Sequence, residues 1–116
     1  MSGLFDETVF NQLGAEIGEA DTLEVLKAFL ADTESKMAGL ANSEVRPLIK
    51  REAHSIKSSA ATFGFGDLSR LARELESGAE TITSARLQDA ISELQQTFEM
   101  TRQFAKTRFI DEELTI

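Results

Sequence analysis

The sequence predicts an all-α protein, an antiparallel up-down-up-down four-helix bundle with a short N-terminal capping helix. Apolar residues recur every three or four positions through five segments, which is the spacing of one face of a helix. No segment alternates apolar and polar residues with the period of two that marks a strand. The connections between the segments are short, and short connections favour antiparallel packing of successive helices.

The first two segments differ in length. A short helix is predicted from residue 4 to about 17, with Asp6 as its N-cap, and is expected to cover one end of the core. The second helix is predicted from residue 21 to about 40, beginning at a capping box of Asp21 and Glu24. The apolar stripe of the second helix comprises Leu23, Leu26, Leu30, Met37 and Leu40, with Phe29 at its margin.

The third helix is predicted from about Glu44 to Phe63. Pro47 fits its first turn, where a missing amide donor costs little. Its core stripe comprises Ile49, Ala53, Ile56, Ala60 and Phe63. His54, the only histidine of the chain, lies on the opposite or flanking side and is therefore expected to point to water.

The remaining chain completes the bundle. Gly64 and Gly66 interrupt the helical pattern and predict a tight turn, after which Asp67 caps a fourth helix that ends near Gly78. Thr83 or Ser84 is expected to cap a long last helix. The apolar stripe of that helix comprises Leu87, Ile91, Leu94, Phe98, Ala105 and Phe109.

The composition fits one folded domain. With 116 residues the chain can bury one core, and residues 1–116 are predicted to form a single domain with its core between about 4 and 109 and a frayed tail at 110–116. The net charge of −8 argues against binding to nucleic acid. The chain has no cysteine, no apolar run long enough to span a membrane and no signal-peptide pattern, so we expect a cytoplasmic protein.

The surroundings of His54 are basic although the protein is acidic. Lys50 and Lys57 lie one turn before and one turn after the histidine. The remaining residues of this predicted docking surface are Arg51 at its edge and the small residues Ser58 and Ala61. An imidazole can act as a nucleophile and carry a covalent group, and nearby ammonium groups stabilise an added phosphoryl group.

These residues resemble the signature of the histidine-containing phosphotransfer (HPt) domains. The matching residues are His54, Ile56, Lys57, Ala61, Gly64, Leu68, Leu75 and Glu76. They cover the middle fifth of the chain residue by residue. The family usually has glycine where Ser58 stands, a departure that crowds the docking surface slightly and could alter partner preference or rate.

The resemblance implies a phosphoryl carrier that is not an enzyme by itself. His54 would accept the phosphoryl group through Nε2 from a receiver aspartate of a response regulator and pass it to another receiver, with Lys57 stabilising the charge. The expected partners are receiver domains and a sensor (hybrid) histidine kinase. No cofactor is expected on this chain, because the receiver supplies Mg²⁺, and a monomer suffices.

Three other classes of protein were weighed. An autonomous histidine kinase needs an ATP-binding domain, for which this chain is too short. A metal enzyme needs further ligands facing His54, where the sequence places lysine and serine. A helical adaptor that binds a receiver or kinase without accepting phosphate stays open.

Four charged residues of the fourth helix are interpreted as a solvated surface of mixed charge, namely Arg70, Arg73, Glu74 and Glu76. For Phe29 the core is the favoured interpretation, and the resemblance offers the docking surface beside His54 as the alternative.

Overall fold

The computed structural model describes residues 3–111, and this part of the chain is helical apart from short connections. Its elements are α1 (Glu7–Ile17), α2 (Glu19–Ala41), α3 (Arg46–Phe63), α4 (Gly66–Gly78), α5 (Ser84–Ala105) and the π-helical turn η1 (Lys106–Ile110). Residues 3–111 contain no strand, so the prediction of an all-α protein is confirmed.

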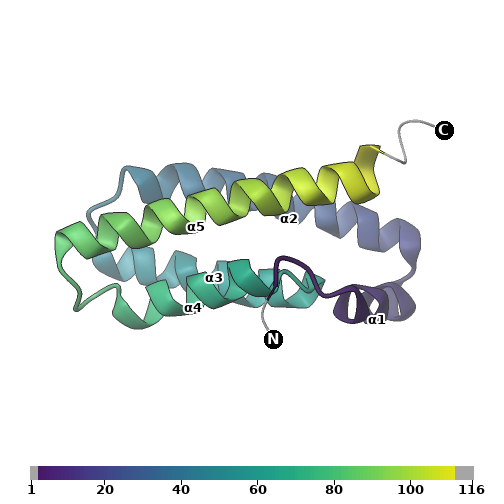
Figure 1. Ribbon diagram of the computed structural model, residues 1–116, viewed down its shortest axis with the longest axis horizontal. Coiled ribbons are helices and arrows are strands. Elements are labelled where there is room, and N and C mark those ends of the chain that lie inside the picture. The colour runs from purple at the N-terminus through teal and green to yellow at the C-terminus, as the bar shows by residue number, and fades with distance from the viewer. Residues whose placement is uncertain (1–2, 112–116) are drawn as a thin grey trace.

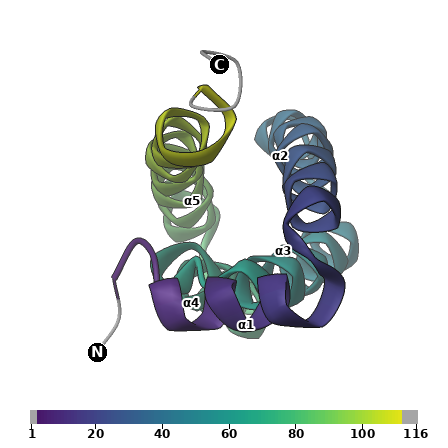
Figure 2. The same ribbon diagram turned by 90° about the vertical axis from the view of Figure 1, so that its right-hand side faces the viewer.

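The helices form an elongated bundle. Figure 1 shows α2, α3, α4 and α5 lying along the long axis of the molecule, which measures 47 Å against 25 and 20 Å for the other two axes. Figure 2 shows α1 lying across one end, beside the ends of α3 and α4. No α1 residue is fully buried, but Phe10 and Leu13 are partly buried against the core, as expected for a helix that covers its end.

The core is built from the predicted stripes. All five residues of the α3 stripe are buried, namely Ile49, Ala53, Ile56, Ala60 and Phe63. Side chains from α2, α4 and α5 close around them, among them Leu26, Leu68, Leu75 and Leu94, each at most 1% exposed. Burial of each such leucine or isoleucine contributes about 2 kcal/mol. The stripe therefore fixes which side of α3 faces outward.

Two of the predicted helix starts are confirmed by their hydrogen bonds. The Asp6 carboxylate accepts from the backbone amides of Thr8 and Val9 at 3.0 and 3.4 Å, so Asp6 is the N-cap of α1. The Thr83 hydroxyl accepts from the Arg86 amide at 3.2 Å and caps α5. Pro47 lies in the first turn of α3, as predicted.

Two other predicted caps are wrong. The second helix begins at Glu19, directly after Gly18, whose φ of 89° ends α1 and lets the next helix start at once; Asp21 therefore lies inside the first turn. Likewise α4 begins at Gly66 after the fully buried Phe65, so Asp67 belongs to its first turn. In both places the backbone turn, and not an acidic side chain, sets the start of the helix.

The turn between α3 and α4 is held by the N-terminal segment. Gly64 has a left-handed φ of 84° and ends α3, and its carbonyl accepts from the Asp6 amide at 2.7 Å. On the other side of the turn, the Asp67 amide donates to the Gly3 carbonyl at 2.9 Å. The turn predicted from Gly64 and Gly66 is thus present, and these bonds join it to the N-terminal segment.

The last helical segment extends further than predicted. Phe109 stacks on Phe10 with ring centroids 4.4 Å apart, and Arg108 forms an ion pair with Glu7 at 2.7 Å. Because these contacts tie the end of the chain to α1, helical structure continues to Asp111 and the tail predicted from 110 begins too early. Residues 112–116 of that predicted tail lie outside the described residues. Within residues 3–111, no helix combines the length and the apolar character needed to cross a membrane.

Candidate functional site

His54 lies near the middle of α3, on the side away from the core stripe. Its side chain is 60% exposed, which confirms the prediction that it points to water. The residues before and after it in the stripe, Ala53 and Ile56, are at most 1% exposed and hold this part of the helix against the core. The imidazole is therefore presented on a rigid element, with room for another molecule to approach it.

The ring is oriented by a carboxylate from the neighbouring helix. Nδ1 of His54 lies 2.7 Å from Oε2 of Glu76 on α4. An ionised carboxylate can only accept hydrogen bonds, so Nδ1 carries the hydrogen and donates it. In a neutral imidazole this leaves Nε2 without a hydrogen, and its lone pair is available as a nucleophile.

The same carboxylate binds the predicted cation. Nζ of Lys57 lies 2.8 Å from Oε1 of Glu76, so the two oxygens of Glu76 hold His54 and Lys57 at once. The hydrogen bond from Lys57, followed by that from His54, lowers the pKa of Glu76 from its ordinary value. Glu76 therefore stays ionised at neutral pH and fixes the positions of both partners.

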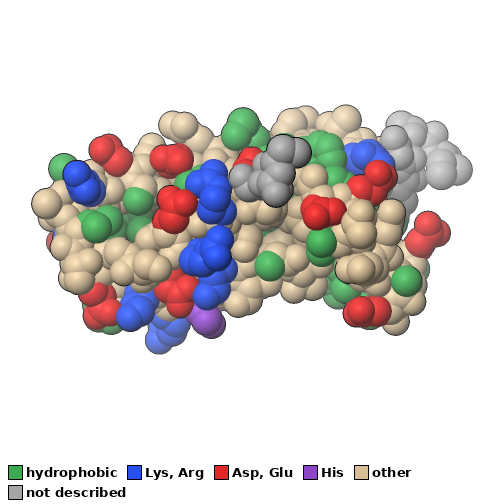
Figure 3. Space-filling model, turned by 60° about the horizontal axis from the view of Figure 1, so that its bottom comes forward, with side chains coloured by type: hydrophobic (Ala, Val, Ile, Leu, Met, Phe, Trp, Pro, Cys, Tyr) green, Lys and Arg blue, Asp and Glu red, His purple; other side chains and the backbone are tan. Residues whose placement is uncertain are grey.

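Most of the other predicted surface residues lie around this group. Lys50 forms an ion pair with Glu80 at 3.1 Å, and the Arg51 side chain is 75% exposed. Ser58 and Ala61 are exposed on the next turns of α3. Figure 3 shows the histidine beside lysine and arginine side chains, with acidic side chains between them. The face is thus basic, and most of its cations have acidic partners.

The docking position considered for Phe29 is wrong. This side chain is 6% exposed, and its ring lies 5.1 Å from that of Phe63 and 5.8 Å from that of Phe65. These aromatic contacts turn it into the core, so it has no surface to offer a partner. The other interpretation of Phe29, as a core residue, is confirmed.

Glu76 is the site residue whose contacts the sequence did not predict. It matched the motif, but its charge was interpreted as part of a solvated surface. Its contact with His54 spans 22 positions of the chain and depends on how α4 packs against α3. The one signal in the sequence was its place in the motif, directly after the buried Leu75.

The described part of the chain, residues 3–111, has no cluster of three or more His, Cys, Asp or Glu side chains that could hold a metal ion. A hollow in that part lies elsewhere, at the end of the bundle between α1, α2 and η1, and is lined by Phe10, Phe109 and Arg108 among others. The chemistry that the geometry offers is therefore concentrated at His54, Lys57 and Glu76.

Comparison with protein-family models gives a match over residues 21–104, to the model described as the Hpt domain. The matched region runs from the first turn of α2 to within one residue of the end of α5 and contains His54, Lys57 and Glu76. No curated protein and no solved structure matches the chain.

Proposed function

The chain belongs to the Hpt domain family, the histidine phosphotransfer domains of two-component phosphorelays, and we propose that it carries the phosphoryl group on His54. Domains of this family are phosphoryl carriers and not enzymes, and they interact with response-regulator receivers and kinases. The observation that carries the proposal is the 2.7 Å contact between His54 Nδ1 and Glu76, because it leaves Nε2 of an exposed ring as the nucleophile.

The proposed step is a direct transfer between two side chains. The Nε2 lone pair attacks the phosphorus of a receiver aspartyl phosphate, the N–P bond forms, and the bond from phosphorus to the aspartyl oxygen breaks. The electron pair of that bond leaves with the aspartate carboxylate. No proton has to move, because Nδ1 keeps its hydrogen and goes on donating it to Glu76 while the ring becomes positively charged. The reverse step passes the group to a second receiver.

Glu76 and Lys57 have complementary roles in this step. Glu76 holds the ring for in-line attack and offsets the positive charge that the ring acquires. Lys57 lies on the same carboxylate, one turn after His54, and its ammonium group offsets the negative charge of the incoming phosphoryl group. This chain needs no further catalytic groups, and the receiver supplies the Mg²⁺.

The scaffold and partners follow the same proposal. An antiparallel up-down-up-down order of α2 to α5 is supported by the short connections between them and by their course in Figure 1. The partners are receiver domains and a sensor (hybrid) kinase of the cytoplasm, and the chain acts as a monomer. Their docking surface is bordered by Lys50, Arg51, Ser58 and Ala61.

The test is phosphotransfer from pre-phosphorylated receiver domains of the same organism to the wild type and to His54→Gln. We expect acid-labile, alkali-stable label on the wild type alone. His54→Gln should stay folded because the side chain is 60% exposed and lies outside the core stripe. Label on His54→Gln would move the acceptor elsewhere. Binding of a receiver without any label on the wild type would favour the adaptor.

A further inference from the structure

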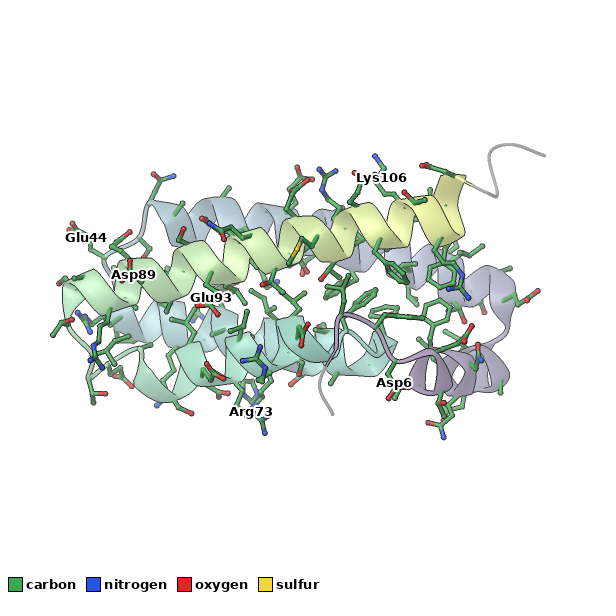
Figure 4. The ribbon with its side chains drawn as sticks, in the orientation of Figure 1. Asp6, Glu44, Arg73, Asp89, Glu93 and Lys106 are labelled. Atoms are coloured by element: carbon green, nitrogen blue, oxygen red, sulfur yellow. The ribbon has the colours of Figure 1, made fainter. Side chains whose placement is uncertain are left out.

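Arg73 lies on the edge of α4 that faces the site. It makes no hydrogen bond or ion pair of its own among the described residues, and the contacts of its neighbours on the helix place it. Ser69, four residues earlier, donates its hydroxyl to the Lys57 carbonyl at 3.0 Å, and Glu76, three residues later, binds His54 and Lys57. Residues three and four apart share one side of a helix. Arg73 therefore emerges between these two contacts, one helical turn from the carboxylate that holds the nucleophile. Figure 4 shows it on the outer side of α4.

The guanidinium of Arg73 differs from its neighbours in having no partner. Helices α3 and α4 carry six basic residues, which are Arg46, Lys50, Arg51, Lys57, Arg70 and Arg73. The first donates to the carbonyls of Ala79 and Ile82, and the next four each have an acidic side chain within 4.0 Å. Among the described residues, Arg73 alone of the six makes no hydrogen bond or ion pair, and it is exposed.

An uncompensated arginine matters on this face because the protein as a whole repels acidic partners. The net charge is −8, and Lys50, Lys57 and Arg70 are each paired with a glutamate. A receiver site that binds Mg²⁺ must present carboxylates, since oxygen ligands are what Mg²⁺ requires. A guanidinium binds a carboxylate through two parallel hydrogen bonds, and an unpaired one does so without first breaking an ion pair.

We propose that Arg73 is a specificity-determining contact of the docking surface, which binds a carboxylate at the rim of the receiver's acidic site and sets the affinity for the phosphorylated receiver. This inference rests on the proposed function. Arg73 acts on encounter and binding, and the transfer itself remains with His54, Glu76 and Lys57. Charges at the rim of an interface act mainly on association and its salt dependence.

The experiment measures transfer from a phosphorylated receiver and from phosphoramidate, a small donor that has no protein surface. Arg73→Ala should raise KM for the receiver about tenfold, leave kcat near that of the wild type and weaken the salt dependence. Labelling by phosphoramidate and the melting temperature should not change. Arg73→Lys keeps the charge but loses the planar guanidinium group. Its KM for the receiver should lie between those of the wild type and Arg73→Ala.

The matched control is Arg86→Ala. Arg86 is also an exposed arginine whose side chain makes no hydrogen bond or ion pair in the described part of the chain, but it lies in the first turn of α5. An unchanged KM in Arg73→Ala, or an equal rise in Arg86→Ala, overturns the inference and leaves the proposed function intact. Transfer from phosphoramidate but from no receiver of the organism also overturns it. If neither donor labels the wild type, the proposed function fails and the inference fails with it.

Discussion

Gly64 is the position where a single methyl group tests how the turn between α3 and α4 is held. Its φ of 84° lies in the left-handed region, which costs a residue with a side chain about 1–2 kcal/mol. A Cβ placed there would lie 2.5 Å from the Asp6 carbonyl oxygen, closer than atoms tolerate, and 3.2 Å from the Val9 Cβ, which is a tight contact. The N-terminal segment must then move, and the 2.7 Å bond from the Asp6 amide to the Gly64 carbonyl is lost at a further cost of about 1 kcal/mol.

We therefore expect Gly64→Ala to lower the free energy of unfolding by about 2–3 kcal/mol. In a domain of this size that corresponds to a fall of about 8–12 °C in the melting temperature. The measurement is thermal unfolding followed by circular dichroism, at the same protein concentration for both proteins. Transfer to His54 should be retained below the transition, because Gly64 lies at the end of α3 and not beside the ring.

Gly39→Ala is the matched control. Gly39 is exposed within α2, has an ordinary helical backbone, and a Cβ there would meet nothing within 4 Å. Alanine should stabilise the helix at this position by about 0.5–1 kcal/mol. The same change from glycine to alanine should thus lower the free energy of unfolding at position 64 and raise it at position 39. A Gly64→Ala protein that melts with the wild type would show that the turn and the N-terminal segment do not constrain each other as described.

Four further predictions concern the core and the charges around His54. Glu76→Ala should slow transfer about tenfold because the ring loses its orienting acceptor, whereas Glu76→Gln, which keeps an acceptor oxygen, should lose less; equal rates for the two in a phosphotransfer assay would contradict the orienting role. Lys57→Ala should slow transfer while the protein stays folded, and an unaltered rate would remove Lys57 from the mechanism. Because the pKa of Glu76 is lowered by Lys57 first and His54 second, its contacts should stabilise the fold above glutamate's ordinary pKa of 4.5 and be lost as the pH falls through the lowered value. A difference in melting temperature between the wild type and Glu76→Gln that persists in acid would refute this pH dependence. Ala60→Glu buries an unpaired charge at a residue 0% exposed and should unfold the protein, while Ala61→Glu, on the exposed neighbour, should not; unfolding in urea distinguishes them.

The helices and the exposure of His54 could be predicted from the sequence because both depend on local periodicity. The apolar spacing from Ile49 to Phe63 identifies the buried side of α3, and the position of His54 within that period places it on the other side. Asp6 and Thr83 were recognisable as caps because a cap bonds to amides two or three residues away. The starts of α2 and α4 were misplaced, since glycine dihedral angles and the burial of Phe65 set them.

The partners of His54, Lys57 and Lys50 were decided by tertiary structure, because each lies on another element or in another part of the chain. Glu76 meets His54 and Lys57 only because the Gly64 turn lays α4 against α3, whereas the neighbouring Glu74 pairs with Arg70 one turn earlier in the same helix. The same packing leaves Arg73 without a partner and turns Phe29 onto Phe63 and Phe65. The sequence by itself determined which residues form helices and which side of each is buried, because those properties repeat within a few residues. Which carboxylate holds His54 and Lys57 depends on a contact between residues far apart in the chain, so the three-dimensional packing decided it.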